Sequence, residues 1–95
     1  MRYGATTDAP GPDVITRAVA TFGPGGLGMQ MTERDLLSAR FENPAGHIAL
    51  EAQRTADERT EVTIETREYD REVQAFIGDL QRQSAVRRWL RRRRS

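Results

Sequence analysis

The sequence predicts a small α+β domain, a two-layer sandwich in which an amino-terminal and a carboxy-terminal helix cover one face of a four-stranded antiparallel meander. Three observations predict this fold. Two segments repeat apolar residues at helical spacing, and four segments between them alternate apolar and polar side chains. The connections are also too short for parallel crossovers. With 95 residues, the chain has room for one domain.

The first helix is predicted over residues 12–22. Residues 1–11 show no periodicity and carry turn-forming residues, so we expect a disordered leader there. Pro12 suits the first helical turn, where its missing N–H costs nothing. One apolar stripe follows, made of Val14, Ile15, Ala18, Val19 and Phe22. Gly23 and Pro24 then end the helix.

Four strands are predicted after this helix, at 27–32, 37–42, 47–53 and 61–67. A strong turn, Asn43-Pro44-Ala45-Gly46, joins the second strand to the third. If that hairpin turns on 43–46, residues whose numbers sum to 89 lie opposite each other. Phe41 then faces Ile48, and Leu37 faces Ala52. Because a slip of one residue would destroy this apolar match, the sequence predicts this register.

The last helix is predicted over 68–84, with acidic residues in its first turn. Residues 12–84 therefore make the single domain, and 85–95 are left as an Arg-rich basic tail. The predicted core consists of Val14, Ile15, Val19, Phe22, Met29, Phe41, Ile48, Leu50, Val62, Ile64, Val73, Phe76, Ile77 and Leu80.

The charge is divided unevenly along the chain. Residues 1–80 hold eight Arg and all fourteen acids, a net charge of −6, whereas residues 81–95 hold seven Arg and no acid, a net charge of +7. All fifteen basic residues are Arg, a composition that favours a GC-rich bacterial genome.

The tail carries the strongest functional signal, because Arg binds phosphates bidentately and a basic run with Trp and Leu suits an anionic lipid surface. The candidate anion-binding residues are Arg87, Arg88, Trp89, Arg91, Arg92, Arg93 and Arg94. Nucleic acid, anionic lipid and an acidic protein surface all remain open as partners. A purely solubilising tail is the competing interpretation.

A second candidate surface is the polar face of the predicted sheet, which one-sided burial leaves open to water. Its charged residues offer a possible partner face, consisting of Arg40, Glu42, Glu51, Glu65 and Arg67. Arginines among the carboxylates favour ordinary cross-strand pairing over a catalytic acid–base pair.

Two apparent motifs point to no chemistry. Residues 23–28 match G-x-G-x-x-G, but the loop follows a helix instead of preceding one, so a phosphate would meet the negative helix end. His47 is the only histidine and the chain has no Cys, which disfavours a zinc site. The expected register also keeps Ser38 roughly 14 Å from His47, too far for a serine nucleophile and its base. We expect His47 to be exposed beside the turn.

The sequence therefore predicts a non-enzymatic binding module with no catalytic residues, cofactor or metal, whose tail contacts an anionic partner. Two alternatives remain: a scaffold that binds through the open sheet face, and a binder of apolar ligands. The latter follows from an arrangement similar to the helix-grip proteins, which hold such ligands between helix and sheet. A homodimer is possible at this size. No apolar segment directs secretion or spans a membrane, so we expect a cytoplasmic protein.

Overall fold

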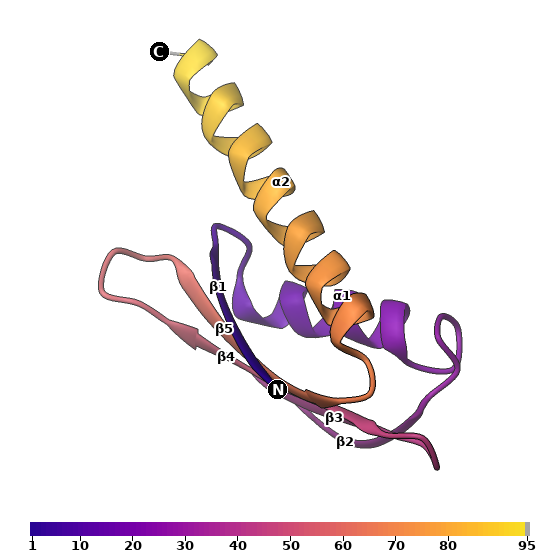
Figure 1. Ribbon diagram of the computed structural model, residues 1–95. Helices are drawn as coiled ribbons and strands as arrows, with labels where there is room; N and C mark the ends of the chain where they lie inside the picture. Colours follow the sequence, from indigo (N-terminus) through magenta and orange to yellow (C-terminus); the bar gives the residue numbers. More distant parts are fainter. Residues whose placement is uncertain (95) are drawn as a thin grey trace.

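The computed structural model describes residues 1–94, and at Arg88 and 91–94 it describes the backbone only. Five strands form one antiparallel sheet in the order β1-β5-β4-β3-β2, and two helices lie on one face of it (Figure 1). The strands are β1 (Arg2–Thr7), β2 (Gln30–Asp35), β3 (Ser38–Glu42), β4 (His47–Arg54) and β5 (Thr60–Arg67). The helices are α1 (Gly11–Phe22) and α2 (Asp70–Arg94).

The predicted α+β class is confirmed, but the prediction of four strands and a disordered leader at 1–11 is wrong. Residues Arg2–Thr7 form the edge strand β1, which pairs antiparallel with β5 from Arg2 opposite Glu65 to Thr7 opposite Thr60. The inward side chains of β1 include Ala5 and Thr7, which are too small or too polar to produce an apolar alternation. The periodicity of apolar residues therefore does not predict this strand.

The β3–β4 hairpin has the predicted register. Phe41 lies opposite Ile48 and Ala39 opposite Leu50, so each pair sums to 89. The turn is closed by Asn43, whose side-chain oxygen accepts hydrogen bonds from the amides of Ala45 and Gly46 at 2.9 Å. This is the local hydrogen bonding that favours Asn at the start of a turn.

The first strand of the meander begins three residues later than predicted. β2 covers Gln30–Asp35 instead of 27–32, and all its residues are exposed. On the apolar side of the predicted strand, the predicted core residue Met29 is buried, whereas Leu27 and Met31 are exposed. The reason is that β2 is an edge strand at the rim of the sheet, beyond the helices. Its alternating apolar side chains are therefore not buried.

The core lies between the sheet and the two helices. Twelve of the fourteen predicted core residues are buried, and the other two, Val19 and Ile77, are half-buried and pack against the core. The ring of Phe22 on α1 packs against those of Phe41 and Phe76, with centroids 5.9 and 5.1 Å apart. These aromatic contacts join α1, β3 and α2 across the core.

Candidate functional site

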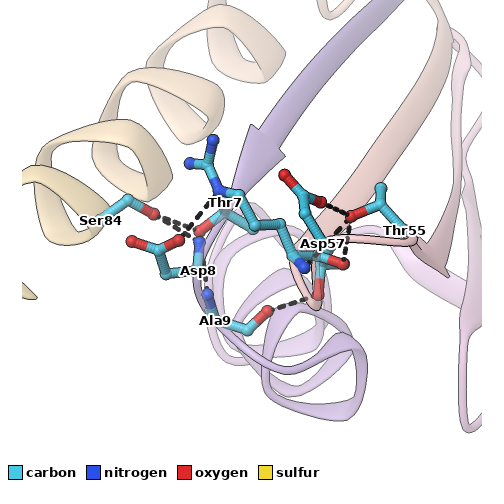
Figure 2. A network of polar contacts seen from close by, with 8 residues as sticks. Thr7, Asp8, Ala9, Thr55, Asp57 and Ser84 are labelled. Atoms are coloured by element: carbon cyan, nitrogen blue, oxygen red, sulfur yellow. Dashed lines mark hydrogen bonds and ion pairs between the residues drawn. The ribbon is translucent and has the colours of Figure 1, made fainter. Parts of the chain in front are cut away.

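The base of the candidate site is the point at which α2 stops packing on the body of the protein. Ser84 is the last buried residue of α2 among the side chains that the structure describes, and its hydroxyl lies 2.7 Å from that of Thr7 at the end of β1. The same Ser84 oxygen accepts a hydrogen bond from the Asp8 amide, also at 2.7 Å (Figure 2). Asp8 in turn pairs with Arg59, with 2.9 Å between Nε and Oδ1. This buried polar network fixes α2 at Ser84.

Beyond Ser84 the helix continues without a break to Arg94 and projects away from the sheet (Figure 1). The basic tail predicted at 85–95 is thus, up to Arg94, the end of α2. Its apolar residues Val86, Trp89 and Leu90 are 55%, 53% and 49% exposed. At spacings i, i+3 and i+4 they share one side of the helix. This side is rotated by roughly half a turn from the buried stripe of Val73, Leu80 and Ser84, as 100° per residue requires.

The predicted anion-binding residues therefore all lie on the projecting part of α2. Trp89 is exposed and Arg87 is half-buried. The side chains of Arg88, Arg91, Arg92, Arg93 and Arg94 lie outside the described residues, so the structure places only their backbone.

One basic residue near this segment was missed by the sequence reasoning. A surface hollow of about 290 Å³ lies between the two helices, lined by Arg17 of α1 and by Arg82, Gln83, Val86 and Arg87 of α2. Arg17 and Arg87 are both half-buried, and no acidic residue is among the lining. The sequence does not indicate that residues 17 and 87 lie close together, because their proximity depends on how the two helices cross.

The possible partner face is assembled by the sheet as expected. In register order Arg40 lies opposite Ala49 and Ala49 opposite Glu65, while Glu42 lies opposite His47 and His47 opposite Arg67. Glu51, the fifth member, lies between Ser38 and Thr63.

Most carboxylates of this face have a nearby cation. Glu42 pairs with Arg40 at 3.4 Å, and Glu65 lies 3.8 Å from both Arg2 and His47. The expectation that His47 is exposed is wrong, because its side chain is only 22% exposed beneath these neighbours. A shallow hollow of about 240 Å³ lies over the small Ala49. The face thus has the mixed charge of an ordinary wet sheet.

The glycine-rich loop has its amides directed toward the protein. The amides of Leu27 and Met29 donate to the carbonyls of Thr21 and Phe22, and those of Gly26 and Gly28 donate to the Gly23 carbonyl. These bonds close the end of α1, so the loop holds the helix terminus and has no free cradle for phosphate. The register likewise separates Ser38, opposite Glu51, from His47, opposite Glu42.

Comparisons of the chain with family models, with curated proteins and with solved structures found no match. None of the helices within residues 1–94 combines the length and apolar character needed to cross a bilayer. The same residues contain no group of three or more His, Asp or Glu side chains placed to hold a metal ion.

Proposed function

We propose that this protein is a small non-enzymatic binding module that contacts an anionic partner through the projecting part of α2. The observation that supports this is the combination of position and charge at 85–94. The helix leaves the body after Ser84, carries six Arg and no acid, and exposes Trp89. The rest of the fold serves as its base.

The physical reason lies in how the charges are separated. Residues 1–80 carry a net charge of −6, which repels polyanions from the body. A helix that projects from the body moves its arginines away from that repulsion, which salt screens beyond about 10 Å. Each Arg close to an anionic lipid surface contributes about 1 kcal/mol, and contacts with nucleic-acid phosphates release counterions. Binding to either partner is therefore expected to weaken steeply as the salt concentration rises.

The fluorescence of Trp89 provides a direct test, because it is the only Trp in the chain. The full chain is titrated with duplex DNA, with single-stranded RNA and with anionic vesicles, each at low and at moderate salt. We expect a saturable change in the emission of Trp89 with at least one of them. A blue shift with vesicles indicates insertion into the lipid interface, and quenching by nucleic acid indicates stacking on bases.

A matched pair of variants makes the test specific. Four Arg-to-Gln changes at 91–94 remove four charges from the tail. Four Arg-to-Gln changes at the exposed Arg34, Arg54, Arg67 and Arg71 remove the same charge from the body. We expect the tail variant to lose binding by at least about tenfold and the body variant to keep it. Absence of binding to every probe at low salt, or equal loss in both variants, contradicts the proposal.

A further inference from the structure

β1 lies at one edge of the sheet, so no other strand pairs with its outer side. Met1 and Thr66 exchange both main-chain hydrogen bonds, at 2.6 and 2.8 Å. In an antiparallel pair the bonded and non-bonded positions alternate, so Tyr3, Ala5 and Thr7 are also directed toward β5. The N–H and C=O groups of Arg2, Gly4 and Thr6 therefore point outward, away from the sheet. All three residues are exposed.

The two edges of the sheet differ in how they discourage pairing. At the opposite edge β2 has a register shift between Met31 and Glu33, and it carries a run of charges at Glu33, Arg34 and Asp35. Bulges and charges of this kind are the usual protection of an edge strand. β1 pairs with β5 in unbroken register over six residues, and its only charged residue is Arg2. An edge without protection is typically one that is covered by something.

We propose that the β1 edge binds the β1 edge of a second copy of this chain, about a twofold axis at Gly4. The two five-stranded sheets then form one continuous sheet. With the axis at Gly4, residues whose numbers sum to 8 lie opposite each other. Arg2 is opposite Thr6 of the second copy, and the two Gly4 residues face each other. Arg2, Gly4 and Thr6 are the residues whose main-chain groups point outward. In this register all of these groups form hydrogen bonds with the second copy.

Charge complementarity favours a second copy in this register. On the open sheet face, Arg2 lies beside Glu65 of its own chain, and Thr6 lies beside Glu61. Across the proposed axis the row becomes Glu65, Arg2, Thr6 and then Glu61 of the second copy. Arg2 and that second Glu61 are two strand spacings apart, or about 10 Å between Cα atoms. Two long side chains of opposite charge can meet over a Thr, so each Arg2 gains a second carboxylate.

The side of α2 that overlooks this edge also suits a second copy. The amide of Gln74 donates to the Tyr3 hydroxyl at 3.5 Å, and Gln81 lines a hollow of about 560 Å³ along Gly4, Ala5 and Thr6. Gly78 and Ala85 continue the same side of the helix at spacings of four residues. This strip carries no charge, whereas the next side of α2 carries Arg71, Asp79 and Arg82. An uncharged strip does not repel the same strip of a second copy, as like charges would.

The first experiment places a thiol at the proposed axis, in a chain that has no Cys of its own. A Cβ added at Gly4 meets only the Val62 carbonyl oxygen, at 4.0 Å, so Gly4→Cys fits the fold. The two Gly4 residues of the proposed dimer lie about 5.5 Å apart. The two Thr6 residues lie four positions apart, or roughly 14 Å.

A bifunctional thiol reagent too short for the longer distance is added to Gly4→Cys and, separately, to the control Thr6→Cys. We expect covalent dimers of the Gly4 variant and at most a trace from the Thr6 variant. Equal crosslinking, or more from Thr6→Cys, overturns the register and with it the proposal.

The second experiment measures association of the full chain by sedimentation over a range of concentrations. Arg2→Glu places a carboxylate between Glu65 and the second Glu61, and we expect it to weaken the dimer by at least about tenfold. Arg34→Glu makes the same charge change on β2 and leaves the dimer unchanged. Adding Glu61→Arg to Arg2→Glu restores association, because Glu61 and Arg2 meet only between copies.

Several outcomes overturn the proposal. A wild-type chain that remains monomeric at every concentration has no such interface, and an edge that captures an extended peptide instead gives this same result. A dimer that Arg34→Glu weakens as much as Arg2→Glu does not use β1. A double variant that fails to recover association excludes the contact between Arg2 and Glu61.

Discussion

The hydroxyls of Thr7 and Ser84 lie 2.7 Å apart and are both buried, although 77 residues separate them in the chain. This bond joins the end of the edge strand β1 to the last packed turn of α2. Thr7 also accepts a hydrogen bond from the Ala9 amide at 3.2 Å, and Thr60 donates to the Ala9 carbonyl at 2.7 Å. One small polar cluster therefore holds the strand, the start of α1 and the projecting helix together (Figure 2).

Replacing Ser84 with Ala should lower the free energy of unfolding by about 1–2 kcal/mol. The change leaves the buried Thr7 hydroxyl and the Asp8 amide without the partner they share, and unsatisfied buried groups cost about that much. Urea denaturation measures the difference. Ser38→Ala on the open sheet face is the control, with an expected change within about 0.5 kcal/mol. If the two variants prove equally stable, the Ser84 network does not anchor α2.

Gly46 is expected to be intolerant of any side chain. A Cβ at this position would overlap the carbonyl oxygen of Arg67, which belongs to the backbone of β5 and has little freedom to move. Gly46→Ala should therefore destabilise the fold by about 2 kcal/mol, as overpacking does. Gly25→Ala is the matched control, because a Cβ there meets nothing within 4 Å. Thermal unfolding of both variants distinguishes them, and similar midpoints would disprove the close approach at Gly46.

The parts of the fold that followed from the sequence are those in which side-chain size enforces one arrangement. The β3–β4 register followed because Phe41, Ile48 and Leu50 are large and would be exposed after a slip of one residue. β1 could not be predicted from the sequence, since it is held by hydrogen bonds to β5 and by small inward residues such as Ala5. Main-chain pairing leaves no periodic trace in a sequence.

The candidate site shows the same division. The charge of the last fifteen residues and the apolar spacing of Val86, Trp89 and Leu90 can be read from the sequence. The continuation of α2 through this segment, and the nearby Arg17, depend on how helices are oriented and where they cross. Those are tertiary properties, which local propensity does not determine.

Tyr3 and Asp70 should make stability depend on alkaline pH. The Asp70 carboxylate accepts a hydrogen bond from the Tyr3 hydroxyl at 2.7 Å, which, together with partial burial and the carboxylate charge, raises the pKa of Tyr3 above its ordinary 10.0. The folded state thus holds this proton more tightly than the unfolded state. The contribution is present in full below pH 10 and is lost as the pH rises through the raised pKa.

Ultraviolet absorbance follows this titration, and a Tyr69→Phe background leaves Tyr3 as the only tyrosine that reports. Asp70→Asn removes the charge and should bring the pKa of Tyr3 back toward 10.0. Tyr3→Phe should remove this part of the alkaline loss of stability. If Asp70→Asn leaves the pKa of Tyr3 unchanged, Asp70 is not the cause of the raised pKa.

Removing residues 85–95 should separate folding from anion binding. None of the described side chains after Ser84 is buried, so we expect the free energy of unfolding to change by less than about 1 kcal/mol. A cut before Leu80 also removes that buried side chain and the Ser84 network, and it should cost several kcal/mol. Chemical denaturation measures both truncations. With Trp89 gone, a DNA or vesicle cosedimentation assay measures binding, which the shorter truncation should abolish at low salt. If that truncation still binds, the anionic partner contacts the body of the protein instead of the end of α2.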